Sequence, residues 1–478
     1  MVEVLFYISF VFITILFFFV VTLLLGWRFF MKGMVRKIGK IIMSDSYQEN
    51  LIELMPGFQH LGIQNTLENS LRAQTGDMLN RPLGSSRYWP HFDSITFLGA
   101  QTGPFPTSKE TEVNVSVTIG PKTKKPMQLE KPFLISGMGY GVGVNEGVRI
   151  AFAQAATETG IAINSGEGGV LPEEVETAEK FILQMSKTEW GKEDEIVKQA
   201  DMIELKLGQG SSMGMGTKIS PDNLTGKARE VMGLEDEQDA IIHEHFFENQ
   251  QLSDFKELID DLRKFTGGVP IGAKIGAGGK IETDIDHLLE MGVDFIAVDG
   301  GQAGTHSSPP ILADDFGIPT LHAVVRAHKH LEKRKVKDKV SLIVSGGLLT
   351  PGHFLKVLAL GADAVYLGSA ILLTVSHHQS LKALPFEPPT QVVWNEGKYS
   401  NTFNVEDGAT TVKNFLNSST EEIREALRAM GKTSLNELST NDLVSYDETT
   451  AHYIGIPYTF KTWEGNGEKT KRNNRKRR

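Results

Sequence analysis

The sequence has no cysteine among its 478 residues, and this absence excludes several kinds of chemistry. A chain without thiols forms no disulfide framework, thiolate zinc site, cysteine-ligated iron–sulfur cluster or cysteine nucleophile. An excess of basic residues is also lacking, since 49 lysines and arginines stand against 59 aspartates and glutamates and give a net charge of −10. Nucleic acid is therefore not expected as a partner, because phosphate binding needs a basic face.

Charged residues are missing from Val4 to Leu25, which form an almost continuous apolar run. A helix of that length crosses a hydrocarbon core of about 30 Å. A secretory signal would carry its positive charges before the run, whereas here only Glu3 precedes it and basic residues begin at Arg28. The positive-inside rule then predicts a single-pass anchor with the N-terminus outside and the catalytic body in the cytoplasm. The alternatives are an uncleaved signal and a buried core helix.

Four regions follow from this pattern. We expect a transmembrane anchor at 1–27, a juxtamembrane linker at 28–87, a catalytic body at 88–445 and a C-terminal extension at 446–478. The extension ends in a basic tail whose charged residues are Lys469, Lys471, Arg472, Arg475, Lys476, Arg477 and Arg478. A solvated tail is expected, with contact to anionic lipid headgroups as the alternative.

From Phe133 onward, short apolar runs alternate with helical patterns, which is typical of βα units around a parallel sheet. Eight runs predict strands: Phe133–Ser136, Ile161–Asn164, Phe181–Met185, Met202–Lys206, Val269–Ile275, Phe295–Asp299, Val340–Ser345 and Ala364–Gly368. Eight such units close a (β/α)8 TIM barrel of the α/β class. An insertion, Gly208–Asn249, follows the fourth strand. Helices are expected at Glu146–Thr159, Ser253–Phe265 with Ser253 as N-cap, Glu282–Met291 and Pro351–Leu360, and two short helices within Thr420–Leu443.

Glycine-rich turns follow seven of the eight predicted strands: SGMGYGVG, NSGEGG, LGQGSSMGMG, IGAGG, DGGQAGT, SGGL and LGS. Glycine lets backbone N–H groups approach an anionic or planar ligand. The last two turns contain Gly346–Gly347 and Gly368–Ser369, where barrels commonly bind phosphate. Any single turn is explained by a tight βα connection, but the whole set predicts a phosphate-bearing cofactor across the barrel mouth.

Polar residues near the strand ends indicate which cofactor the barrel binds. Lys274 lies inside the apolar strand PIGAKIG, where a lysine is costly to bury without an anionic partner. A reduced FMN ring is one such partner, because it carries negative charge near N1, and the Asp299 carboxylate is the alternative. Glu167, among three glycines, is suited to acid–base catalysis or to capping the next helix.

The motifs ISGMGYG, INSGEGG, IELKLGQG, AKIGAGG, DGGQAGT and SGGLLTPGHFLKVLALGADAVYLGSA resemble, in order and spacing, the FMN-binding synthase domain of glutamate synthase. The resemblance extends upstream to RYWPHFD and downstream to VKNFLNSSTEEIREALRAMGKTSLNEL, and so covers roughly residues 88–445. It implies a barrel that binds FMN and takes up 2-oxoglutarate. Ammonia then gives 2-iminoglutarate, which reduced FMN converts to L-glutamate by hydride transfer from N5.

The resemblance also implies roles for individual residues. The cofactor would contact Ser136, Gly137, Met138, Asn164, Gln209, Lys274, Asp299, Gly300 and Gly301, and its phosphate Gly346, Gly347, Gly368 and Ser369. The catalytic or substrate-binding residues would be Glu167, Lys206 and Gln209. No metal site is expected.

Two departures from the family pattern are informative. This chain has Ser212 where the family has its second loop lysine, and Met215 where the family has a loop glutamate. The substrate is therefore expected to be 2-oxoglutarate or a similar acid. Where the family holds a 3Fe–4S cluster with three cysteines, this chain reads LTVSHHQSLKALPFEPPTQ. We therefore expect FMN without an iron–sulfur cluster, a separate electron donor, and nitrogen from free ammonia or a partner amidotransferase.

Two other functions stay open. An FMN barrel that oxidises another small acid or amine would need a histidine base, for which His306 is the best candidate. A flavin-binding membrane protein without activity is the non-enzymatic alternative.

Overall fold

The computed structural model describes residues 2–460, so the predicted basic tail at 469–478 lies outside the described residues. The chain divides into two compact units, one covering residues 1–79 and the other beginning at Asn80.

The first unit is helical. Its elements are α1 (Val2–Ser44), a 3-10 turn (Leu51–Glu53), α2 (Leu54–Leu61) and α3 (Ile63–Thr75). The stretch Phe6–Ser44 is long and apolar enough to cross a membrane, and its most apolar window is not buried within the chain, unlike a core helix. The helix continues past the predicted anchor boundary at residue 27. The buried side chain of Asn50 ends it, because its Nδ2 donates to the Ile42 carbonyl at 2.8 Å.

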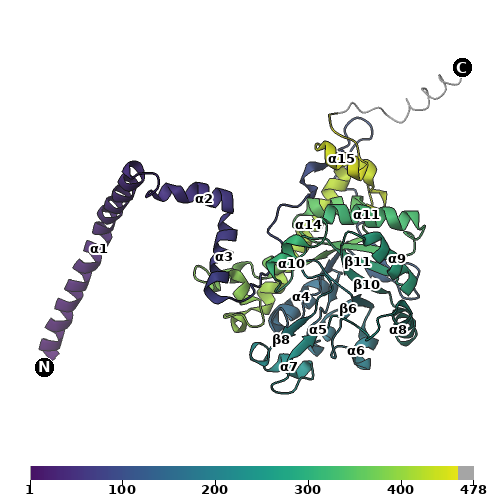
Figure 1. Ribbon diagram of the computed structural model, residues 1–478, viewed down its shortest axis with the longest axis horizontal. Coiled ribbons are helices and arrows are strands. Elements are labelled where there is room, and N and C mark those ends of the chain that lie inside the picture. Colours follow the sequence, from purple (N-terminus) through teal and green to yellow (C-terminus); the bar gives the residue numbers. More distant parts are fainter. Residues whose placement is uncertain (1, 461–478) are drawn as a thin grey trace. The chain divides into compact units, whose positions relative to one another are not determined.

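The second unit is built around a closed barrel of eight parallel strands, which confirms the predicted TIM barrel (Figure 1). The strands are β4 (Phe133–Ile135), β5 (Ala162–Asn164), β6 (Phe181–Met185), β7 (Met202–Lys206), β10 (Ile271–Gly276), β11 (Phe295–Asp299), β12 (Ser341–Ser345) and β13 (Ala364–Leu367). They pair in chain order, and β13 closes the barrel by pairing with β4 through Tyr366 and Leu134. Every predicted strand is present.

Helices surround the strands (Figure 1). They are α4 (Glu146–Glu158), α5 (Pro172–Thr177), α6 (Asp194–Gln199), α8 (Leu252–Phe265), α9 (Ile281–Met291), α10 (Pro310–Asp315), α11 (Thr320–Lys333), α12 (Pro351–Ala359), α13 (Ser369–Val375), α14 (Val405–Ala429) and α15 (Glu448–Ile454). The insertion after β7 contains β8 (Thr217–Ile219), α7 (Lys227–Val231) and β9 (Ala240–Ile242), with β8 and β9 forming an antiparallel hairpin.

Two details of the helix prediction are wrong. The N-cap of α8 is Gln251, not Ser253, because Gln251 forms a reciprocal capping box with Asp254. The segment Thr420–Leu443 does not form two short helices. Instead α14 runs unbroken from Val405 to Ala429 and is followed by 3-10 turns at Leu435–Glu437 and Thr440–Asp442 and by β14 (Leu443–Ser445), which pairs with β1 (Ile95–Phe97).

The barrel interior changes from apolar to polar along the strands. Because side chains alternate with period two, Met202, Glu204 and Lys206 of β7 share one face, as do Phe295, Ala297 and Asp299 of β11. The first residues of these sets, Met202 and Phe295, belong to one buried apolar cluster with Ile119, Met127 and Leu129. These three come from the hairpin of β2 (Val117–Ile119) and β3 (Met127–Leu129), which therefore closes the N-terminal end of the barrel.

A fully buried ion pair joins α4 to α5. Arg149 donates through Nε to Glu174 Oε2 at 3.1 Å and through Nη2 to Glu174 Oε1. The same guanidinium donates to the carbonyls of Met138 and Asn164, each at 2.9 Å. Burial raises the pKa of the Glu174 carboxyl, and the Arg149 charge opposes that shift. One side chain thus holds two helices and the turns after β4 and β5 together.

Replacing Glu174 with Gln should lower the free energy of unfolding by about 3 to 5 kcal/mol, because it leaves a buried guanidinium without its counter-charge. Urea unfolding monitored by tryptophan fluorescence measures the change. Glu173→Gln is the matched control, since its carboxylate is exposed and pairs with Lys227 at the surface, and should cost less than about 1 kcal/mol. Equal losses from both variants would contradict this account of the pair.

Candidate active site

A network of buried polar side chains lies inside the C-terminal half of the barrel. Asn164 Nδ2 donates to Glu204 Oε1 at 2.8 Å and to the Tyr366 hydroxyl at 3.0 Å. Gln184 Nε2 donates to the same Glu204 oxygen at 2.7 Å. Burial, with the Glu204 charge next, raises the pKa of Tyr366 well above its usual value, which keeps the phenol neutral. The second Glu204 oxygen is buried and has no hydrogen-bond partner within residues 2–460.

This network orients the turn after β5. With its Nδ2 engaged by Glu204 and Tyr366, Asn164 presents Oδ1 to the Gly166 N–H at 2.9 Å. Gly166 has a positive φ of 71°, and a Cβ there would lie 2.4 Å from the Gly139 nitrogen. Only glycine allows these two turns to approach so closely.

Lys274 is buried and pairs with Asp299, at 3.3 Å between Nζ and Oδ2. The structure thus shows the carboxylate partner that the sequence left as an alternative to the flavin. Burial alone lowers the pKa of Lys274, but Asp299 and Glu204 together hold it above its ordinary value, so the ammonium stays charged. Asp299 also accepts from the Ser345 hydroxyl and from the Gly210 N–H at 3.3 Å. One carboxylate therefore links β10, β11, β12 and the loop after β7.

Lys206 and Glu167 are brought together at the mouth. Lys206 Nζ lies 2.5 Å from Glu167 Oε1, joining the end of β7 to the turn after β5. Glu167 does not cap the next helix, because the N-cap of α5 is Leu171. Trp190 Nε1 donates to the Glu167 carbonyl at 3.1 Å and fixes the backbone of this turn. Lys206 is a cation that can bind a carboxylate, and Glu167 is an acid–base group that is partly exposed to solvent.

The loop after β7 folds onto the loop after β11. Gln209 and Met213 exchange backbone hydrogen bonds, with Ser211 and Met213 in the left-handed region at φ of 65° and 51°. This strained conformation is held because the Ser211 hydroxyl donates to the Ala303 carbonyl. Gln209 Nε2 donates to Ser212 Oγ at 3.1 Å and to Thr305 Oγ1 at 3.3 Å.

The two loop positions that differ from the family pattern, Ser212 and Met215, lie in this same loop. Ser212 contacts Gln209, whereas Met215 is exposed.

Lys187 was not among the predicted site residues, and it holds the insertion against the barrel. Its ammonium donates to three carbonyls, those of Gly214 at 2.8 Å, Glu244 at 3.0 Å and Leu207 at 3.2 Å. Burial, with the nearby Lys206 charge second, lowers the pKa of Lys187. No motif marks this lysine, because its partners are backbone atoms.

The turns after β11, β12 and β13 lie beside each other at the mouth. A Cβ on Gly300 would lie 2.0 Å from Thr320 Oγ1, so the start of α11 packs directly on this turn. The Thr320 hydroxyl donates to the Gly346 carbonyl at 2.8 Å. Within the described residues, the N–H groups of Gly346 and Gly347 donate to no protein acceptor, and Ser369 begins α13. Open backbone donors are what an anionic group requires.

The remaining predicted residues belong to the same region. Gly137 packs on Asn164 and Gln184, the Met138 carbonyl accepts from Arg149, and the Ser136 N–H donates to Leu367 across the barrel seam. Gly301 donates its N–H to the Ile318 carbonyl at 2.7 Å, and Gly368 is the N-cap of α13.

The segment that stands in the place of the cluster cysteines is held by amide hydrogen bonds. Gln379 is buried, its Nε2 donates to the Asn404 carbonyl at 2.9 Å, and its Oε1 accepts from the Asn404 N–H at 2.7 Å. The same region brings Glu396 within 2.7 Å of His306 Nε2, with the imidazole edge-on to Trp394. The Nε2 atom of the candidate base His306 is thus occupied by its contact with Glu396.

Residues 72–433 match the family model described as the conserved region in glutamate synthase. A glutamate synthase large subunit-like protein of Rhizobium meliloti is 28% identical over 82% of this chain and 92% of its own length. An archaeal-type glutamate synthase (NADPH) of Thermotoga sp. (strain RQ2) is 27% identical over 77% of each chain. The flavin-binding domain of baker's yeast flavocytochrome b2 superposes with a TM-score of 0.48 at 18% identity, covering 82% of this chain and 87% of that one.

Replacing Lys187 with Met should loosen the loop after β7, because three carbonyls lose their common donor. Amide hydrogen exchange over residues 208–216 should become at least about tenfold faster while exchange in the barrel strands stays unchanged. Lys218→Met is the matched control, since that lysine lies on β8 and pairs with Asp239 at the surface. Unaltered exchange in the Lys187 variant would refute the tethering role.

Proposed function

The chain belongs to the glutamate synthase family of oxidoreductases that act on CH–NH2 donors, and we propose that it reductively aminates 2-oxoglutarate to L-glutamate with FMN as its cofactor. The observation that carries the proposal is the Lys206–Glu167 pair, which lies next to the buried cation of Lys274 at the barrel mouth.

The donor set of the mouth suits FMN. The charged Lys274 offers a positive group for the electron-rich ring, and the open N–H groups of Gly346 and Gly347, with Ser369, suit a phosphate. Ser136, Gly137, Met138, Asn164 and Gln209 would surround the ring, and Asp299, Gly300, Gly301 and Gly368 would support it. Bound FMN supplies the hydride chemistry that no side chain in this site provides.

The catalytic roles follow from the two charged groups at the mouth. Lys206 is suited to bind a substrate carboxylate, because its ammonium is held at the end of β7 with only a small exposed fraction. Glu167 is suited to move protons between the attacking nitrogen and the departing carbonyl oxygen when ammonia adds to the 2-oxo group. Gln209 offers an amide to the same substrate and is positioned by Thr305. Ser212, in place of the family's loop lysine, offers a hydroxyl and no positive charge to a second carboxylate.

Electrons and nitrogen come from outside this chain in our proposal. Without cysteine, no 3Fe–4S relay is held here, so a separate donor reduces the flavin directly. Nitrogen comes from free ammonia or a partner amidotransferase. The apolar helix α1 would anchor the protein as a single-pass membrane protein with the barrel in the cytoplasm.

Glu167→Gln tests the catalytic assignment. The purified protein should be yellow and release FMN on heating, and after anaerobic reduction it should reoxidise and form glutamate on addition of 2-oxoglutarate and ammonium. The variant should keep its flavin but form glutamate at least about 100-fold more slowly, since it loses acid–base catalysis. Glu189→Gln, an exposed glutamate in the turn after β6, should react normally.

The possible outcomes test the cofactor assignment and the substrate assignment separately. A folded but colourless protein overturns the FMN assignment. A yellow protein that forms no glutamate overturns the assignment of the acid, and a Glu167→Gln variant with full turnover removes Glu167 from the mechanism.

A further inference from the structure

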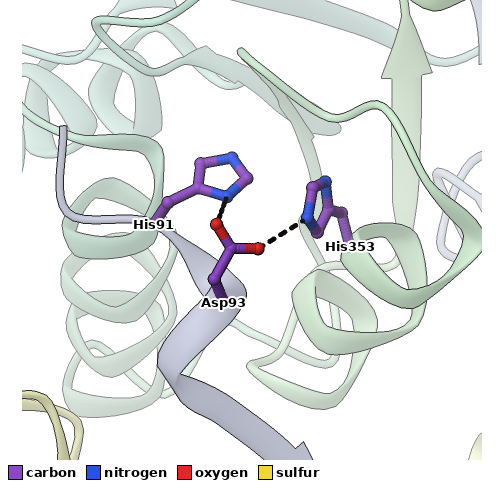
Figure 2. Close-up of side chains that lie close together, drawn as sticks. All are labelled: His91, Asp93 and His353. Carbon is purple, nitrogen blue, oxygen red and sulfur yellow. Dashed lines mark hydrogen bonds and ion pairs between the residues drawn. The ribbon is translucent and has the colours of Figure 1, made fainter. Parts of the chain in front are cut away.

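Three side chains with metal-binding atoms meet at the rim of the barrel mouth, outside the site described above (Figure 2). Asp93 lies in the 3-10 turn Phe92–Ser94, His91 precedes that turn, and His353 lies in the first turn of α12. One ligand atom from each lies within 4.8 Å of the other two. Two belong to the RYWPHFD motif, to which the proposed function assigns no chemical role.

The orientation of His91 is set by a backbone carbonyl. Its Nε2 lies 3.0 Å from the Gly347 carbonyl oxygen, and because a carbonyl only accepts, the ring proton is assigned to Nε2. The lone pair of Nδ1 then points toward Asp93, 3.8 Å from Oδ2. A histidine whose second nitrogen donates to a carbonyl is the usual arrangement of a metal ligand, because that hydrogen bond fixes both tautomer and ring direction.

The other histidine faces the same space. His353 Nε2 lies 3.2 Å from Asp93 Oδ1, and the two imidazole rings are perpendicular with centroids 4.5 Å apart. Both rings are largely covered, with 18% and 13% of the side chains exposed, and Phe92 packs against each of them. Asp93 is 78% exposed, so the carboxylate side is open to water and to an incoming ion.

A plain histidine–aspartate hydrogen bond explains this cluster less well. His330 and Asp286 form such a pair in the same barrel, at 2.8 Å and without a second imidazole. The distances from Asp93 to His91 and to His353 are both longer than 2.8 Å, and two histidines lie beside one carboxylate. His91 donates through Nε2 to the Gly347 carbonyl, which leaves Nδ1 free to bind a metal ion. A simple histidine–aspartate pair does not need this second hydrogen bond.

We propose that His91, Asp93 and His353 bind one Zn²⁺ ion through His91 Nδ1, one Asp93 oxygen and His353 Nε2, with water completing a tetrahedral site. Two imidazole nitrogens and one carboxylate oxygen suit a borderline divalent ion of this kind. Binding requires the His353 proton to reside on Nδ1, which breaks the weak 3.4 Å contact from the Leu349 N–H. The ion would tie the segment before β1 to α12 and, through His91, to the Gly347 turn.

Metal binding to the full-length protein tests the site directly. The detergent-purified chain is freed of metal with a chelator, dialysed against micromolar Zn²⁺, and analysed for zinc per chain and for Kd by competition with a metal indicator. We expect one Zn²⁺ per chain. Co²⁺ in place of Zn²⁺ should give ligand-field absorption bands at wavelengths above the flavin absorption.

The variants are chosen to keep the fold. His91→Gln places an amide N–H near the position of Nε2, so the Gly347 carbonyl keeps a donor while the Nδ1 ligand is lost. His353→Gln and Asp93→Asn remove the other two ligands with little change of shape. Each should raise the Kd for Zn²⁺ at least about tenfold and abolish the Co²⁺ bands. His330→Gln, from the ordinary histidine–aspartate pair, should bind like the original chain.

A wild-type chain that binds no Zn²⁺, or variants with wild-type affinity and folded-state circular dichroism, would overturn the proposal. An equal loss in His330→Gln would also do so, because the binding would then not depend on these three residues.

Discussion

A charge inside a closed barrel is stable only if it has a partner, and this constraint shapes the mouth of the protein. Lys274 requires Asp299, and Asp299 in turn engages Ser345 and the Gly210 N–H. Three strands and the loop after β7 are therefore joined at one carboxylate. The glycine turns around it are positioned by that shared contact, so the proposed cofactor site and the loop packing depend on the same buried charges.

A second set of buried charges lies outside the strands and fixes two further turns of the barrel mouth. Arg149 and Glu174 are completely buried between α4 and α5, and Arg149 also binds the carbonyls of Met138 and Asn164. The turns after β4 and β5 therefore owe their shape to a helix pair rather than to the barrel alone. In the turn after β6, Lys187 plays a comparable part for the insertion.

Sequence patterns predicted the strands well because parallel barrel strands are short, apolar and followed by glycine. They failed at α14, where two short helices were expected within Thr420–Leu443 and the residues before Thr420 were not assigned to a helix. In the structure Ser419 and Thr420 are buried, and the Thr420 hydroxyl bonds back to the Leu416 carbonyl, so the helix continues.

Charged turn residues such as Glu167 could be proposed from the sequence because they stand among glycines. Glu204 and Gln184 were missed although the period of two along β6 and β7 places them inside the barrel. Their partners come from other strands, which no local pattern reveals. The same holds for His91 and His353, which are far apart in the sequence.

The hairpin of β2 and β3 has a kinetic consequence. Since Ile119, Met127 and Leu129 fill the N-terminal end of the barrel, soluble reactants reach its interior only from the opposite end. In the proposed reaction, the reductant and the acid substrate would enter through this one end, so each would have to leave before the other binds. Alternating binding of this kind would give ping-pong kinetics, with parallel lines in double-reciprocal plots and mutual competition at high concentration.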